Sequence, residues 1–171
     1  CYTGLRYGDY YNINTYGIRK NERGSFLHVA TQKTREPVVI PANWMLLEIL
    51  DKYDGNVPKP YSNQEMNRDL KVIGEDAGIK EKVGLSITKG GMRVDSVNNK
   101  YDLISTHTAR RSFATNAYLA GVPTLSIMKI TGHRTEKSFL RYIKMSQEDN
   151  ANKLIEHPYF SQQKPAEMKK V

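Results

Sequence analysis

Apolar and polar positions in residues 16–40 form short β-prone runs rather than the spacing of a helix. Two such runs, at 25–30 and 37–40, flank a polar segment, and residues 21–24 supply an earlier turn. The pattern predicts a small antiparallel sheet of two or three strands. Ahead of it, residues 1–11 are interpreted as the end of one helix entering a turn.

Helical spacing of apolar residues begins after residue 43 and is interrupted at 56–61, a loop that holds two prolines. Ser62 and Glu65 then have the spacing of a capping box, which predicts the start of a second helix. Apolar residues recur on one face of this helix as far as Gly78, and we expect them to be buried. The members of this stripe are Met66, Leu70, Ile73 and Ala77.

Residues 79–104 combine three glycines and several lysines with short β-prone pieces, among them 86–88 and 101–104. This mixture favours either a basic loop or a second hairpin. Both alternatives remain open at the level of the sequence.

The last third of the chain has helical periodicity throughout. Thr106 is the predicted N-cap of the first helix there, and Gly121 and Gly132 are the expected ends of the first two. Residues 146–160 are a candidate for packing either on their own domain or against a neighbouring subunit, and amphipathicity alone favours their own domain. The stripe expected to face the core comprises Ala109, Phe113, Ala117 and Ala120. The predicted helices are 106–120, 123–131, 135–143 and 146–156. The whole pattern predicts a mainly helical α+β fold with a small antiparallel β-sheet.

The composition is that of a folded, basic protein. The 171 residues include 26 Lys and Arg against 18 Asp and Glu, which gives a formal charge of +8 and a pI near 9.5. A basic excess favours a polyanionic partner, most often nucleic acid, although charge alone does not separate such a protein from one that is merely soluble. The sequence has no apolar run approaching the ~18–20 residues that cross a bilayer, so no membrane partner is expected.

The cysteine and histidine content argues against disulfide and metal chemistry. Cys1 is the one cysteine, and the four histidines are too scattered for a zinc-binding helix, so no metal and no cofactor are expected. The chain begins with Cys1 rather than Met, inside an apolar-aromatic stretch, and is therefore interpreted as a piece of a longer protein.

Four short motifs carry candidate chemistry, and their order is more specific than any one of them. They are Thr3-Gly4-Leu5-Arg6; Gln32-Lys33-Thr34 followed by Val-Val-Ile-Pro at 38–41; His107-Thr108-Ala109-Arg110; and Thr131-Gly132-His133 with Tyr142 nine residues after the histidine. In these motifs and their order, from residue 3 to about 145, the sequence resembles the tyrosine recombinases, or phage integrase family. The chain departs from the family's pattern after the first arginine: the acidic residue three positions on is Asp9, a shorter acid, and its neighbours are Tyr7, Gly8 and Tyr10 rather than small aliphatic residues.

The resemblance implies the fold and reaction of a tyrosine recombinase catalytic domain over 1–160, with 161–171 as a flexible tail. It implies a site-specific recombinase or integrase that cleaves and rejoins double-stranded DNA through a 3′-phosphotyrosine intermediate, without metal or ATP. It further implies an N-terminal DNA-binding domain outside this chain, a homotetramer on DNA, and a cytoplasmic, DNA-associated protein of a bacterium, phage or mobile element. The catalytic residues that it implies are Arg6, Lys33, His107, Arg110, His133 and Tyr142.

These residue types suit strand cleavage by transesterification. Tyr142 would attack phosphorus and conserve the phosphodiester energy in a covalent bond. A phenol has a pKa near 10, so its attack needs proton removal or a strongly positive site. Arg6 and Arg110 would hold the nonbridging oxygens with planar, permanently charged forks. Lys33 is the natural general acid for the leaving 5′ oxygen, because its ammonium carries a transferable proton.

Several assignments stay open. His107 and His133 can each accept a proton or bond a phosphate oxygen. Arg110 and Arg111 lie on a similar helix face relative to His107, and only the resemblance selects Arg110. Type IB topoisomerases share the tyrosine and arginine chemistry, a non-catalytic DNA-binding module would keep the same fold, and a plain basic RNA-binding domain is a third alternative.

Overall fold

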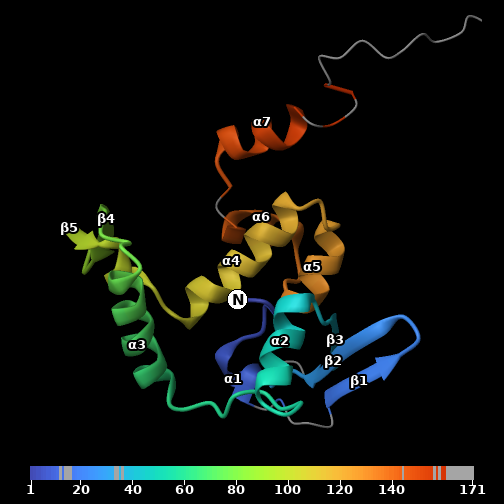
Figure 1. The fold of residues 1–171 in the computed structure, drawn as a ribbon. Coiled ribbons are helices and arrows are strands. Elements are labelled where there is room, and N and C mark those ends of the chain that lie inside the picture. Colours follow the sequence, from blue (N-terminus) through green and yellow to red (C-terminus); the bar gives the residue numbers. More distant parts are fainter. Residues whose placement is uncertain are drawn as a thin grey trace, which may run out of the picture.

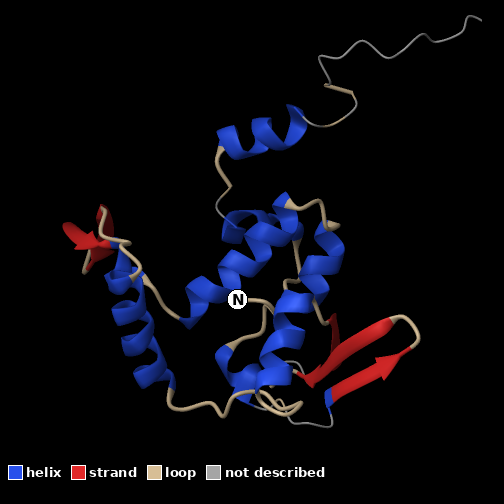
Figure 2. Cartoon of the chain, viewed as in Figure 1, coloured by secondary structure: helices blue, strands red, loops and turns tan. Residues whose placement is uncertain are grey.

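The computed structural model describes residues 1–11, 13, 17–32, 35, 37–143, 145–155, 157, 159 and 160. The described chain is mainly helical with two small antiparallel sheets, which confirms the predicted α+β class (Figures 1 and 2). The elements are α1 (Tyr7–Tyr11), β1 (Ile18–Asn21), β2 (Gly24–Ala30), β3 (Pro37–Pro41), α2 (Trp44–Lys52), α3 (Asn63–Asp76), β4 (Lys82–Lys89), β5 (Met92–Asn99), the 3-10 helix η2 (Lys100–Leu103), α4 (Thr106–Leu119), α5 (Thr124–Thr131), α6 (Glu136–Ile143) and α7 (Gln147–Ile155).

The first hydrophobic core lies on one face of the three-stranded sheet, whose strands are ordered β1-β2-β3. Alternate residues of β3 and of the end of β2 are buried, as the period of a strand requires when one face is covered. The sheet and its turn at 21–24 confirm the sequence prediction. This core consists of Leu5, Ile13, Leu27, Val29, Val38 and Ile40.

The chain opens with an irregular segment, so the interpretation of residues 1–11 as the end of a helix is wrong. The helix α1 begins only after Arg6, whose carbonyl accepts the N–H of Tyr10 at 2.9 Å. Gly4 has a φ of 64°, and a Cβ at this position would overlap the ring of Phe113 on α4. Glycine therefore permits both the turn and the close approach of this segment to α4.

Helices α4, α5 and α6 pack around a second core. The buried positions of α4 are Arg110 and Ala114, while Ala120 is exposed, so the face that is buried is rotated from the predicted stripe. A buried arginine lies on this face because it bonds backbone carbonyls of two other segments. The residues of the second core are Ala114, Ile127, Met128, Phe139 and Ile143.

The N-cap of α4 is Ser105, not Thr106 as predicted. The hydroxyl of Ser105 accepts the N–H of Thr108, and the hydroxyl of Thr108 accepts the N–H of Ser105, which completes a capping box. The N–H of Thr106 instead donates to the side-chain oxygen of Asn67 on α3, at 2.8 Å. The start of α4 is thereby tied to α3.

Helix α3 begins at the predicted capping box but does not bury the predicted stripe. Ser62 accepts the N–H of Glu65 at 3.2 Å. Ile73 is 61% exposed and Ala77 is also exposed, because α3 stands beside the body of the molecule and packs on η2 instead (Figure 1). The contact is made through Gly74, the one buried residue of α3.

Of the two alternatives for residues 79–104, the hairpin is confirmed. Strands β4 and β5 pair in antiparallel register around Gly90 and Gly91, both at positive φ. The β-prone piece at 101–104 falls largely in η2, so its assignment as β structure is wrong. The hairpin projects at the far end of α3 (Figure 1).

Helix α7 extends away from the bundle, so the expectation that 146–160 packs on its own domain is wrong for the described residues (Figure 1). Leu154 and Ile155 on this helix are exposed. Among the described residues, no helix has the length and apolar character needed to span a bilayer.

Candidate active site

Five of the six predicted site residues lie close to one another, and the sixth, Lys33, is outside the described residues. The five described residues come from four parts of the chain: Arg6 just before α1, His107 and Arg110 on α4, His133 directly after α5, and Tyr142 on α6. No three His, Cys, Asp or Glu side chains of the described chain gather in a way that would hold a metal ion.

Arg6 is held by Asp9, an almost fully buried carboxylate. The Nη1 atom of Arg6 lies 3.5 Å from Oδ2 of Asp9, which is 2% exposed. The other carboxylate oxygen, Oδ1, accepts the backbone N–H of Gln32 at 2.8 Å. Gln32 directly precedes Lys33 in the sequence. Asp9 therefore contacts both Arg6 and the residue before Lys33. The aspartate side chain, although shorter than that of glutamate, reaches both.

Gly132 closes α5 and makes room for Arg6. Its φ of 62° is left-handed, and its N–H bonds the carbonyl of Met128. A Cβ at this position would lie 3.3 Å from Nη2 of Arg6. The glycine thus meets two needs, a left-handed helix end and a close approach by a guanidinium.

Arg110 is 5% exposed and joins two distant segments. Its Nη1 donates to the carbonyl of Gly4 at 2.7 Å, and its Nη2 donates to the carbonyl of Thr131. The first bond holds the segment before Arg6, and the second holds the end of α5 before His133. Arg110 therefore fixes the relative positions of other site residues as well as bringing its own charge.

The two histidines flank the ring of Tyr142. Its centroid lies 5.2 Å from that of His107, edge to face, and 4.7 Å from that of His133. Burial lowers the pKa of both histidines below the usual value, and the neighbouring cations lower both pKa values further: Arg111, Arg110 and Arg6 for His107, and Arg110 and Arg6 for His133. Both imidazoles are therefore mainly neutral at pH 7 and able to accept a proton.

The hydroxyl of Tyr142 is buried and forms no well-aligned hydrogen bond with the residues that the structure describes, although the Arg110 guanidinium lies within reach of it. Burial raises the pKa of this phenol, while Arg110, Arg111 and Arg6 act in the opposite direction, with the Arg110 guanidinium close by. A buried hydroxyl without a well-aligned hydrogen bond costs stability, so its retention calls for an explanation other than packing.

Sequence reasoning left Arg110 and Arg111 unresolved, and the structure separates them. Arg110 turns into the protein toward two carbonyls, whereas the guanidinium carbon of Arg111 lies over the ring of Tyr142, 5.5 Å from its centroid. The Nε atom of Arg111 is buried with no hydrogen-bond partner in the described chain. Its position four residues after His107 was the available signal, since such residues share a helix face.

Thr131 is a second residue that the sequence motifs did not assign. It is fully buried, its carbonyl accepts a bond from Arg110, and its hydroxyl contacts Nδ1 of His133 at 2.7 Å. The sequence shows only that Thr131 lies two residues before His133, which does not specify this contact.

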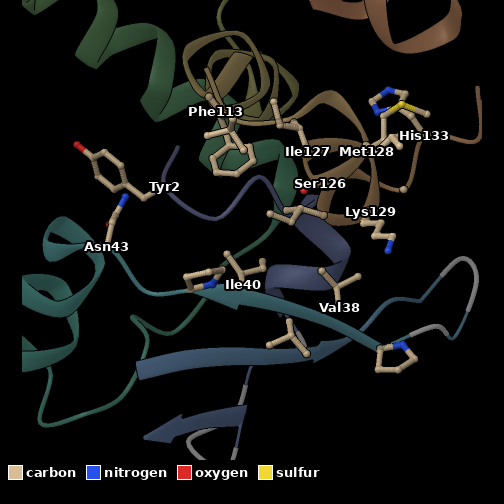
Figure 3. A pocket seen from close by; sticks show the side chains of 18 of the residues that line it. Tyr2, Val38, Ile40, Asn43, Phe113, Ser126, Ile127, Met128, Lys129 and His133 are labelled. Carbon is tan, nitrogen blue, oxygen red and sulfur yellow. The ribbon is translucent and has the colours of Figure 1, made fainter. Parts of the chain in front are cut away.

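An apolar groove of about 1100 Å³ runs beside the site between β3 and the helices α4 and α5 (Figure 3). Val38 and Ile40 line one side, and Phe113 and Ile127 line the other. The groove reaches His133 but its lining does not include Tyr142. The clustered side chains therefore lie at its margin rather than within it.

Comparison with known proteins shows the family and the fold of the chain. The family model described as "Phage integrase family" matches residues 1–149. The fold is similar to a crystal structure of XerA recombinase, with a TM-score of 0.64 and 18% identity over 92% of this chain and 54% of that one. It is also similar to XerH site-specific recombinase bound to palindromic difH substrate in a post-cleavage complex, with a TM-score of 0.61 and 12% identity over 90% of this chain and 42% of that one. The chain thus spans about half the length of these structures. The sequence matches none of the curated proteins with which it was compared.

Proposed function

The chain belongs to the phage integrase family, and from this premise we propose that it supplies the catalytic domain of a site-specific DNA recombinase that forms a 3′-phosphotyrosine intermediate through Tyr142. The observation that carries the proposal is the state of this phenol. Its hydroxyl is buried without a well-aligned hydrogen bond to the described residues, its ring lies between two imidazoles, and three arginines are close to it, Arg110 within reach of the hydroxyl.

The proposed cleavage step begins with attack of the Tyr142 oxygen on the scissile phosphorus. The phenolic proton leaves as the bond to phosphorus forms, and the P–O5′ bond breaks. The side chain of Arg6 is 35% exposed, and it would bind the nonbridging oxygens. Arg110 and Arg111 would stabilise negative charge on the phosphate and on the developing phenolate, since both are cations beside Tyr142.

Lys33 would donate the proton that the departing O5′ needs. An ammonium releases a proton far more readily than a guanidinium, so the lysine suits this proton transfer better than any of the three arginines. Gln32, the described residue before it in the sequence, donates its backbone N–H to Asp9, which also pairs with Arg6. Rejoining would reverse each transfer, with a 5′ hydroxyl attacking the phosphotyrosine.

Double-stranded DNA is the proposed partner, bound by a catalytic domain over 1–160 within a longer protein that assembles as a tetramer. A formal charge of +8 and exposed lysines at 80, 82, 89 and 100 support binding to phosphates, which gives affinity without sequence information. The likeness to XerH bound to its palindromic difH substrate supports the same class of partner.

The test of the proposed function is capture of the covalent intermediate. A nicked suicide substrate that carries the cognate recombination site should leave a DNA adduct on the protein, and mass spectrometry of the digested conjugate should find the nucleotide on Tyr142. An adduct on another residue, or none with the full-length protein on its own site, contradicts the proposal. Relaxation of supercoiled plasmid without a recombination site would instead favour the topoisomerase alternative.

We expect Gly132→Ala to slow adduct formation by crowding Arg6. The substitution places a Cβ 3.3 Å from Nη2 of Arg6 and forces a left-handed conformation that costs about 1–2 kcal/mol for alanine. Gly121→Ala is a matched control, because Gly121 has a φ of 82° but nothing within 4 Å of its Cβ position. Both variants should lose similar stability in urea unfolding, and only Gly132→Ala should lose adduct yield. Equal yields from the two would show that contact with Arg6 is unimportant.

A further inference from the structure

The β4–β5 hairpin has one polar and one largely apolar face. Residues that are paired across an antiparallel ribbon lie on the same face, and successive pairs alternate between the two faces. Ser86 pairs with Asp95 and Thr88 pairs with Arg93, so these four side chains share the polar face, which holds one apolar side chain, Val97. The apolar side chains of the opposite face are Val83, Leu85, Ile87, Met92 and Val94.

Arg93 is held in one orientation on the polar face. Its Nε donates to Oδ1 of Asp95 at 3.0 Å, and its Nη2 donates to the hydroxyl of Ser86 at 3.0 Å. The same hydroxyl donates to Oδ1 of Asp95. A guanidinium has five N–H groups, and these bonds use two of them. No hydrogen bond within the described chain uses Nη1. The outer edge of the guanidinium, formed by Nη1 and the remaining N–H of Nη2, is therefore available to a ligand.

This network contributes little to stability, because the side chains of Arg93 and Asp95 are 74% and 65% exposed and water screens their attraction. Hydrogen bonds from Ser86 and then from Arg93 hold the pKa of Asp95 below its usual range, so the carboxylate stays ionised at pH 7 and retains Arg93. The network instead provides a guanidinium whose orientation is fixed in advance. A planar fork of this kind matches two oxygens of a phosphate.

The charge of the hairpin favours a polyanion as its ligand. Residues 80–100 contain five exposed Lys and Arg against two acids, and both acids are already paired within this segment, Glu81 with Lys100 and Asp95 with Arg93. A second copy of this chain, with its own formal charge of +8, would be repelled. The cations that form no ion pair in the described chain are Lys80, Lys82 and Lys89.

The hairpin is joined by a short connection to the helix that carries His107 (Figure 1). Strand β5 packs on η2, and η2 packs on α3. Seven residues separate Asn99, the end of β5, from His107. Eight steps of extended chain span at most about 28 Å, the length of roughly eight base pairs at about 3.4 Å each. A duplex whose scissile phosphate lies at the candidate active site therefore extends far enough to meet the hairpin.

We propose that the β4–β5 hairpin is a separate DNA-binding element, whose polar face contacts backbone phosphates near the cleavage site through Arg93 and Lys82, with Asp95 and Ser86 as positioning residues for Arg93. The choice of duplex DNA as the polyanion rests on the proposed function. Contacts of this kind add affinity without reading the sequence, and they take no part in the chemistry at Tyr142.

The experiment compares the full-length wild type with Arg93→Gln in DNA binding over a range of salt concentrations, on duplexes with and without the recombination site. Loss of a phosphate contact should weaken binding to both duplexes about tenfold. It should also reduce the slope of log affinity against log salt concentration by about 0.9. Adduct formation at saturating DNA should keep the wild-type rate. Arg93→Lys retains the charge without the fork, so its affinity should lie between the two.

Two further variants test the positioning role and the choice of face. Asp95→Ala makes the hairpin more positive, yet it should weaken DNA binding because Arg93 loses the partner that orients it. Ile87→Thr changes the opposite face, where Ile87 is 57% exposed, and should bind DNA as the wild type does. Stronger binding by Asp95→Ala would show that charge alone acts and would overturn the positioning role.

Unchanged affinity and salt dependence in Arg93→Gln overturn the inference, as does a loss confined to the duplex with the recombination site, which would indicate a base contact. If Ile87→Thr abolishes self-association in sedimentation while Arg93→Gln binds DNA normally, the hairpin contacts a second copy of the chain instead. A wild-type protein that forms no adduct, but whose DNA binding falls on Arg93→Gln substitution, overturns the proposed function and supports the present inference.

Discussion

Replacement of Tyr142 by phenylalanine is expected to abolish the covalent adduct while leaving the fold and DNA binding intact. The change removes only the hydroxyl, which is the proposed nucleophile. That hydroxyl is buried and forms no well-aligned hydrogen bond in the described chain, although Arg110 lies within reach of it, so its loss should change the free energy of unfolding little. The measurements are adduct yield on a nicked substrate, a DNA-binding isotherm and urea unfolding.

Tyr10→Phe is the control for Tyr142→Phe and should give the opposite result. The hydroxyl of Tyr10 donates to the carbonyl of Pro58 at 2.6 Å, so its removal should cost about 1 kcal/mol of stability. Adduct formation should continue in that variant. An adduct that persists in Tyr142→Phe would mean that another residue is the nucleophile, and a large loss of stability there would mean that the hydroxyl has a structural role.

The sequence predicted those elements whose signals are local. The β-prone runs, the turn at 21–24 and the helix start at Ser62 depend on neighbouring residues, and all three are present in the structure, with Ser62 as an N-cap that accepts the N–H of Glu65. The predictions of burial were wrong where the apolar face of a helix is exposed, or where residues distant in the sequence decide which face is covered. The face of α3 that includes Ile73 is exposed, because the helix packs on η2 through Gly74.

The candidate site was predictable as a set of residues but not as a network. Motif order selected Arg6, His107, Arg110, His133 and Tyr142, and these lie together. The connections among them run through backbone carbonyls, as in the bonds from Arg110 to Gly4 and Thr131. A carbonyl has no signature in the sequence, since every residue carries one. The burial of the two histidines, which lowers their pKa values, also has no signature in the sequence.

Arg110→Ala is expected to lose both adduct formation and stability, because this side chain combines a charge with two structural bonds. Its removal leaves the carbonyls of Gly4 and Thr131 without their charged donor in a buried region. At roughly 1.5–3 kcal/mol for each of these two hydrogen bonds to a charged group, the free energy of unfolding should fall by about 3–6 kcal/mol. Loss of a transition-state donor should also cost roughly a hundredfold to a thousandfold in the rate of adduct formation.

Arg6→Ala separates these two effects, because Arg6 brings a charge without bridging carbonyls. Its side chain is 35% exposed and pairs at 3.5 Å with Asp9, which is 2% exposed, so its loss costs more than the ~1 kcal/mol of a surface pair. We expect a loss of rate similar to that of Arg110→Ala with a smaller loss of stability, because water reaches the Arg6 side of the pair, measured by urea unfolding and single-turnover cleavage at a temperature where both variants are folded. A stable Arg110→Ala would contradict the bridging role, and a fully active one would leave Arg110 a structural residue only.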